Sequence, residues 1–241
     1  MLYFGATAQR LIMTTISANL QAVLARIDAA AHASGRNPSE IRLLAVSKTW
    51  PASAVCEAAD AGQKMFGENY VQEGVDKVTA LAGRGFEWHF IGPLQSNKTR
   101  RVAETFDWVH SVDRLKIAER LSEQRPSNLP KLQICLQVNV SGEASKSGVA
   151  LHEVPALALH LAALPGLQLR GLMAIPEPLS DFSAQREPFR QLREIYENLK
   201  KNGLALDTLS MGMTHDLEAA IAEGATIVRV GTAIFGERIK Q

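Results

Sequence analysis

The chain has 241 residues, of which 46% are hydrophobic and 21% charged, and its formal net charge is +1. This composition is ordinary for a globular protein, and the absence of a long basic run argues against binding to nucleic acid or to a membrane surface. No apolar run approaches the roughly 20 residues that a membrane span requires. The two cysteines, Cys56 and Cys135, lack CxxC spacing, so we expect no disulfide framework and a cytoplasmic location.

The first twelve residues, MLYFGATAQRLI, are too short and too weakly basic for a secretory signal. We interpret residues 1–12 as a leader or an expression remnant. No linker rich in proline, glycine or serine divides the remaining chain, so residues 13–241 are expected to form one domain.

Short apolar runs alternate with longer helical segments along this domain. The N-terminal helix is expected over 14–34, with Gly35 ending it. Strands are expected at 43–47, 64–67, 87–91, 108–111, 132–140, 169–175, 206–210 and 226–230. Helices are expected near 51–61, 70–82, 97–105, 113–124, 151–163, 183–201 and 215–222, the last capped by Thr214.

Strands that alternate with helices favour parallel pairing with right-handed crossovers. A TIM-like (β/α)8 barrel suits the chain length, because such barrels typically have about 250 residues. A doubly wound open sheet is the alternative, although no GxGxxG motif follows the first expected strand. The sequence therefore predicts an α/β barrel preceded by an extra N-terminal helix.

In such barrels the functional residues lie at the C-terminal ends of the strands. Lys48 follows the apolar run LLAV, so its amine is expected to emerge in the barrel mouth. Burial disfavours an ammonium, and a neutral amine is what a carbonyl cofactor needs to form a Schiff base. The alternative is a solvated lysine at a strand end.

Two turns that combine glycine with a hydroxyl follow the seventh and eighth expected strands. Gly231 and Thr232 open a short turn or helix, and Ser210 and Gly212 lie in the neighbouring turn. Barrels often bind phosphate there, where backbone N–H groups and a helix dipole favour an anion. The alternative is that these glycines only allow strand-to-helix turns with positive φ.

Further polar residues lie within or directly after expected strands. Arg229 requires an acceptor when buried, either a ring nitrogen of a ligand or a structural carboxylate. His89 and His110 are interpreted as core histidines with satisfied hydrogen bonds, because no third ligand is spaced for a metal. Asn69 could position a ring substituent or cap the helix that follows it.

Six ordered blocks give the chain a close resemblance to the pyridoxal phosphate homeostasis protein family. They are LLAVSKTWP at 43–51, FGENYVQE at 66–73, WHFIGPLQSNK at 88–98, SKSG at 145–148, RGLMAIP at 170–176 and SMGMTHDLEAAIAEGATIVRVGTAIFG at 210–236. The resemblance extends from about Thr14 to the C-terminus. One departure is Thr214, where serine is usual, and a hydroxyl is retained.

This resemblance implies a barrel like the N-terminal domain of alanine racemase, with pyridoxal 5'-phosphate (PLP) as its cofactor. By similarity, Lys48 bears the cofactor and Arg229 faces the pyridine nitrogen. The resemblance also implies that Ser210, Gly231 and Thr232 hold the phosphate and that Asn69 and Met211 line the pocket.

The resemblance also implies a protein with little or no catalysis of its own, linked to vitamin B6 homeostasis. Racemases of this fold place a second acid/base, a tyrosine from a C-terminal domain, opposite the lysine. The chain ends soon after its barrel, so we expect no such residue.

Three functional hypotheses follow. The first is a monomeric PLP carrier that supplies apo-enzymes. The second is a single-domain racemase or decarboxylase that uses water or His89 as its second base. The third is a barrel that binds another phosphorylated small molecule, with Lys48 as a plain charge contact.

Overall fold

The computed structural model describes residues 4–142 and 147–237, and for residues 4–15 it describes the backbone alone. The strands are β1 Arg42–Val46, β2 Met65–Glu68, β3 Glu87–Phe90, β4 Trp108–Val112, β5 Leu132–Asn139, β6 Val149–Ala150, β7 Leu167–Met173, β8 Thr208–Ser210 and β9 Ile227–Val230. The α-helices are α1 Phe4–Ala33, α2 Ala52–Asp60, α3 Val71–Ala80, α4 Thr99–Thr105, α5 Leu115–Gln124, α6 Val154–Ala162, α7 Phe182–Lys201, α8 Leu217–Ala222 and α9 Thr232–Phe235.

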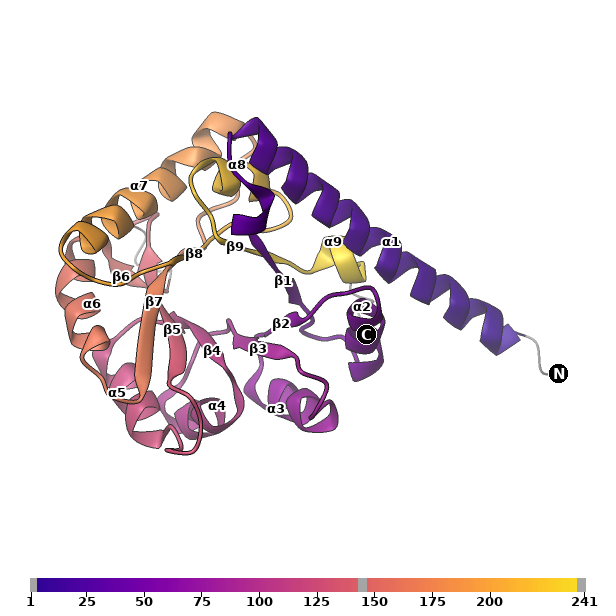
Figure 1. Ribbon diagram of the computed structural model, residues 1–241, viewed down its shortest axis with the longest axis horizontal. Coiled ribbons are helices and arrows are strands. Elements are labelled where there is room, and N and C mark those ends of the chain that lie inside the picture. The colour runs from indigo at the N-terminus through magenta and orange to yellow at the C-terminus, as the bar shows by residue number, and fades with distance from the viewer. Residues whose placement is uncertain (1–3, 143–146, 238–241) are drawn as a thin grey trace.

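The strands close into a parallel barrel, as the alternation predicts. Their order is β4-β3-β2-β1-β9-β8-β7-β5, and β4 also pairs with β5, so within the described chain the sheet has no open edge apart from the short β6. This closure excludes the doubly wound alternative. Figure 1 shows the helices arranged around the strands, with α8 between α7 and the N-terminal helix α1.

Strand register separates an outer apolar layer from a mixed barrel interior. On β5, Leu132, Ile134 and Leu136 belong to the large hydrophobic core beneath the helices. Cys135, between them, forms a separate cluster with Trp108 and Met173. Since successive side chains of a strand point to opposite faces, this second cluster lies inside the barrel.

The N-terminal helix differs from its predicted start. α1 begins at Phe4 rather than Thr14, and it ends at Ala33, with Gly35 in the positive φ region (+66°) that terminates many helices. Figure 1 shows it as a long helix lying against α8 and α9. Arg36 donates to the backbone carbonyls of Ile221 and Ala225, which fixes the end of α1 on α8.

One other local expectation is wrong. Thr214 does not cap the last helix before β9, because α8 begins after Asp216. A short strand that the sequence did not predict, β6, pairs with β5 at Val138 and Val149. No helix among the described residues is long and apolar enough to cross a membrane.

Candidate functional site at the C-terminal barrel mouth

A cavity of about 260 Å³ opens at the C-terminal ends of the strands. It is lined by Val46, Lys48, Trp50, Asn69, Ile91, Ile175, Met213, Thr214, His215, Arg229, Gly231, Thr232 and Gly236. Five of the predicted site residues are therefore brought together: Lys48, Asn69, Arg229, Gly231 and Thr232. Their origin in β1, β2 and β9 explains this, since parallel strands present their carboxyl ends on one face.

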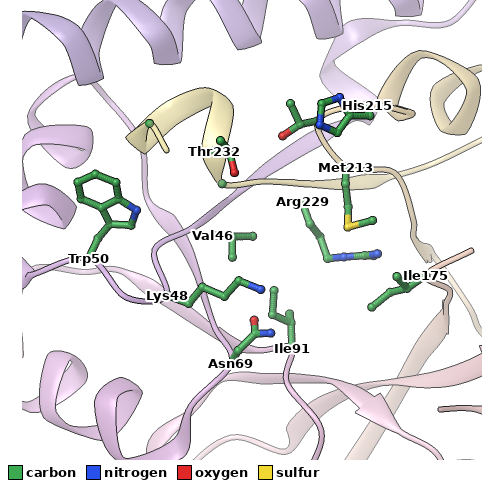
Figure 2. A pocket seen from close by; sticks show the side chains of 13 residues that line it. Val46, Lys48, Trp50, Asn69, Ile91, Ile175, Met213, His215, Arg229 and Thr232 are labelled. Carbon is green, nitrogen blue, oxygen red and sulfur yellow. The ribbon is translucent and has the colours of Figure 1, made fainter. Parts of the chain in front are cut away.

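One residue, Ser47, separates Lys48 from the end of β1, and Lys48 is half-buried. Figure 2 shows its side chain extending into the cavity, with its amine near Val46, Ile91 and Asn69. The aliphatic stem thus lies against apolar walls while the amine reaches the centre. This is the placement predicted for a nucleophilic lysine at the first strand end.

Asn69 enters the cavity from the end of β2, and its backbone packs tightly against the next strand connection. A Cβ on Gly92 would come within 2.0 Å of the Asn69 carbonyl oxygen, so glycine is required there for this approach. The side-chain Oδ1 of Asn69 is buried and has no hydrogen-bond partner among the described residues. A buried acceptor of this kind favours a ligand that brings a donor.

Arg229 forms the floor of the cavity from within β9 and is 3% exposed. Its Nη1 donates to Ser210 Oγ at 2.8 Å, and its Nη2 donates to the Ala174 carbonyl at 2.9 Å. Burial lowers the pKa of the Arg229 guanidinium to about 10, and the carboxylate of Asp216 opposes that shift. The side chain is therefore a cation at neutral pH that is oriented by two neutral acceptors.

Gly231 and Thr232 form the start of the short helix α9. The φ of Gly231 is −116°, so a turn that needs positive φ does not explain the glycine. A Cβ there would lie 3.1 Å from the Val46 carbonyl oxygen, which identifies close packing of β9 on β1 as the reason. The side of α9 is held by Trp50, whose ring stacks on Phe235 with centroids 6.0 Å apart.

Comparisons with known proteins define the relationships of this chain. The family model for the N-terminal domain of alanine racemase matches residues 18–239. A protein from Pseudomonas aeruginosa, named pyridoxal phosphate homeostasis protein, is 62% identical over 226 residues, covering 94% of this chain and 97% of that protein. The protein of the same name from Escherichia coli K12 is 58% identical over 229 residues, covering 94% and 98%.

The chain belongs to the pyridoxal phosphate homeostasis protein family. Among solved structures, PipY of Synechococcus elongatus with PLP bound superposes with a TM-score of 0.79 at 38% identity. That similarity covers 92% of this chain and all of PipY. The resemblance inferred from the six sequence blocks is thus confirmed, as is the predicted barrel fold.

Three of the predicted pocket residues, Ser210, Met211 and Gly212, are not among the residues that line this cavity. Met211 is fully buried in the hydrophobic core, away from the cavity lining. Ser210 is also fully buried, and its hydroxyl is already bonded to Arg229 and His110. Gly212 has a φ of +91° and packs against Ala220, where a Cβ would meet the alanine Cβ at 2.5 Å.

The neighbouring Met213 and Thr214 line the cavity instead. The turn after β8 passes through Gly212 before it reaches the barrel mouth. Within this turn, Asp216 Oδ1 accepts a hydrogen bond from the Met213 N–H at 2.6 Å. Burial raises the pKa of this Asp216 carboxyl. The hydroxyl at the family's usual serine position, Thr214, is therefore at the site.

The two strand histidines have saturated hydrogen bonding, as predicted for core histidines. His89 bonds to Glu87 and His110, and His110 bonds to Ser210. No group of three or more potential ligands among the described residues is arranged to hold a metal ion. Ser145 and Lys146 of the SKSG block lie outside the described residues.

Trp50 and His215 also line the cavity, although strand-end reasoning did not select them. Both lie beyond the residues that end a strand. A single sequence gives no signal that marks Trp50 as a cavity residue. His215 offered no signal apart from its proximity to Thr214.

Proposed function

We propose that this chain binds PLP as a Schiff base on Lys48 and serves intracellular vitamin B6 homeostasis without catalysing a reaction of its own. The observation that carries this proposal is the position of Lys48, whose side chain extends into a cavity that also contains Arg229 and Asn69. Relatives at 62% and 58% identity are named for PLP homeostasis, and the PipY structure contains PLP.

The residues at the cavity fit the polar groups of PLP. The buried Oδ1 of Asn69, which has no partner among the described residues, suits the phenolic hydroxyl of the ring. Arg229 would face the pyridine nitrogen, and Gly231, Thr232 and Thr214 would hold the phosphate. When bound, PLP supplies an aldehyde for a reversible imine and a ring that withdraws electrons from adjacent bonds.

Two features support a carrier rather than an enzyme. Arg229 is a cation at neutral pH, so it opposes protonation of an adjacent ring nitrogen and weakens the electron sink. Of the described tyrosines, Tyr70 is exposed beside α3, and the Tyr196 hydroxyl donates to the Leu206 carbonyl. Neither lines the cavity, so neither supplies a second acid/base.

One observation favours an amino-acid racemase or decarboxylase as the second candidate. His215 lies at the cavity rim and is exposed, and an imidazole there could exchange a proton with a bound amino acid. The two candidates differ in whether the α-proton of an amino acid exchanges with solvent.

The deciding experiment loads the purified protein with PLP and makes two measurements. Transfer is measured by the activity that the loaded protein restores to an apo PLP-dependent enzyme separated by a dialysis membrane. Exchange is measured in D2O by mass spectrometry of added amino acids. A carrier restores activity and exchanges no more deuterium than free PLP. Exchange that disappears in both Lys48→Ala and His215→Ala would establish the enzyme instead.

The remaining parts of the proposal concern location and assembly. We place the protein in the cytoplasm as a monomer, with PLP and apo PLP-dependent enzymes as its partners. The buried thiol of Cys135 and the unpaired Cys56 fit a reducing compartment. Sedimentation of the purified protein at micromolar concentration tests the monomer.

A further inference from the structure

A continuous chain of hydrogen bonds runs through the barrel interior from the cavity floor to the opposite mouth. Arg229 Nη1 lies 2.8 Å from Ser210 Oγ, and Ser210 Oγ lies 2.7 Å from His110 Nδ1. His110 Nε2 lies 2.8 Å from His89 Nδ1. His89 Nε2 lies 2.7 Å from Glu87 Oε1. The four links join β9, β8, β4 and β3.

The far end of this hydrogen-bond chain reaches solvent. Glu87 is the first residue of β3, its side chain is 39% exposed, and it lines a second cavity at the N-terminal mouth with Arg42, Trp108 and Arg170. His89 and His110 are fully buried. The hydrogen-bond chain therefore connects the partly solvated carboxylate of Glu87 to the guanidinium of Arg229 beneath the ligand cavity.

The carboxylate at the end fixes the direction of every link. The hydrogen bond from His89, aided by nearby Arg42 and Arg170, lowers the pKa of Glu87, so this group is ionised and only accepts. Burial lowers the pKa of both imidazoles, so each is neutral and carries one proton. His89 must then hold its proton on Nε2 and accept at Nδ1.

The remaining hydrogen bonds, on the cavity side of His89, have the same donor direction. His110 Nε2–H donates to His89 Nδ1, which leaves His110 Nδ1 as an acceptor. The Ser210 hydroxyl donates to that nitrogen, and its oxygen accepts from Arg229. All four hydrogen bonds donate in one direction, from the cationic guanidinium toward the carboxylate. Links aligned in this way polarise and strengthen one another.

We propose that Ser210, His110 and His89 are positioning residues for Arg229, and that this chain, terminated by Glu87, sets the orientation of the guanidinium toward a ligand ring. This inference rests on the proposed function. Without this hydrogen-bond chain, the guanidinium of Arg229 retains the Ala174 carbonyl as an acceptor and can rotate about that contact. Core histidines that only fill space would transmit nothing from Glu87.

The first part of the test examines the chain in the protein without ligand. 15N NMR of histidine-labelled protein is expected to show His89 and His110 neutral near pH 7, each protonated at Nε2. Glu87→Gln is expected to shift the ring nitrogens of both histidines. Protonation of His110 at Nδ1, or ring nitrogens unchanged by Glu87→Gln, would overturn the chain.

The second part measures the dissociation constant for PLP. Ser210→Ala removes one charged-donor hydrogen bond and is expected to weaken binding roughly tenfold. Ser210→Thr keeps the hydroxyl and is expected to restore most of the affinity. Glu87→Gln, at the far end of the chain, is expected to weaken binding roughly threefold.

Asp207→Asn is the matched control, because Asp207 pairs with Arg170 near the same mouth and lies outside the chain. We expect it to change PLP affinity less than roughly twofold. Equal effects of Glu87→Gln and Asp207→Asn, or normal binding by Ser210→Ala, would contradict the proposal. If the wild-type protein fails to bind PLP, the proposed function is wrong. The NMR measurement still decides whether the hydrogen-bond chain from Arg229 to Glu87 forms.

Discussion

The ammonium of Lys77 lies 2.7 Å from the backbone carbonyl of Ser47, the residue immediately before Lys48. The same ammonium is 2.7 Å from Oε1 of both Glu68 and Glu73. Glu73 in turn accepts the backbone N–H of Thr49, the residue immediately after Lys48. Both chain neighbours of the lysine are therefore fixed by one cluster of charges on β2 and α3.

Removal of Lys77 is expected to destabilise this cluster strongly. Lys77→Met leaves the fully buried Glu68 without its cation, and loss of one partner of a buried pair costs about 3–5 kcal/mol. Chemical denaturation measures the loss, and PLP uptake should fall because Ser47 is released. Lys64→Met, at an exposed lysine, should leave both properties unchanged. The double variant Lys77→Met/Glu68→Gln should recover part of the stability. If it recovers none, the loss in Lys77→Met does not come from an unpaired carboxylate on Glu68.

Gly212 is expected to be required for stability rather than for ligand contact. Gly212→Ala introduces both a positive φ for alanine and a Cβ 2.5 Å from the Ala220 Cβ, so we expect a loss of about 2–4 kcal/mol. Gly83→Ala has a similar φ of +80° with nothing within 4 Å, and it should cost only about 1–2 kcal/mol. Equal losses in thermal or urea unfolding would show that the packing against α8 is not limiting.

Stability is expected to fall as the pH is lowered below the ordinary histidine range. Burial holds the pKa of His89 and His110 below the unfolded value of about 6.5, so the unfolded chain binds more protons there. Arg229 and Arg42 act on His110 in the same direction. Each histidine contributes a slope of up to about 1.4 kcal/mol per pH unit between the unfolded and folded pKa.

Urea unfolding between about pH 5 and pH 8 measures this slope. His110→Asn should flatten it, although the variant is less stable at every pH. His32→Asn, which changes an exposed histidine on α1, should leave the slope unaltered. An equal slope below pH 6 in the wild-type protein and in His110→Asn would mean that this imidazole binds a proton as readily in the folded protein as in the unfolded chain.

The barrel was predictable from the sequence because its signals are local. Apolar runs of strand length alternate with helical periodicity, and glycines such as Gly35, Gly62 and Gly203 adopt the positive φ typical of residues just beyond a helix end. Lys48, Asn69 and Arg229 line one cavity because each belongs to a strand or to the residues that follow it. Parallel strands gather such positions without further information.

The side of the cavity next to β8 was only partly predictable. Ser210 ends β8, but its side chain faces the barrel interior, and the turn through Gly212 carries Thr214 to the mouth instead. The direction of a strand-end side chain depends on register, which a single sequence does not define. The Lys77 cluster and the histidine chain were not predicted because their partners are distant in sequence and meet only after the barrel closes.

The central claim is most directly tested by trapping the cofactor on its lysine. The PLP-treated protein is reduced with borohydride, digested and analysed by peptide mass spectrometry. We expect a yellow protein before reduction and one pyridoxyl adduct on Lys48, absent from Lys48→Ala and retained in Lys64→Ala. A colourless protein that forms no adduct, or an adduct that persists in Lys48→Ala, would contradict the assignment of this barrel mouth as a PLP site.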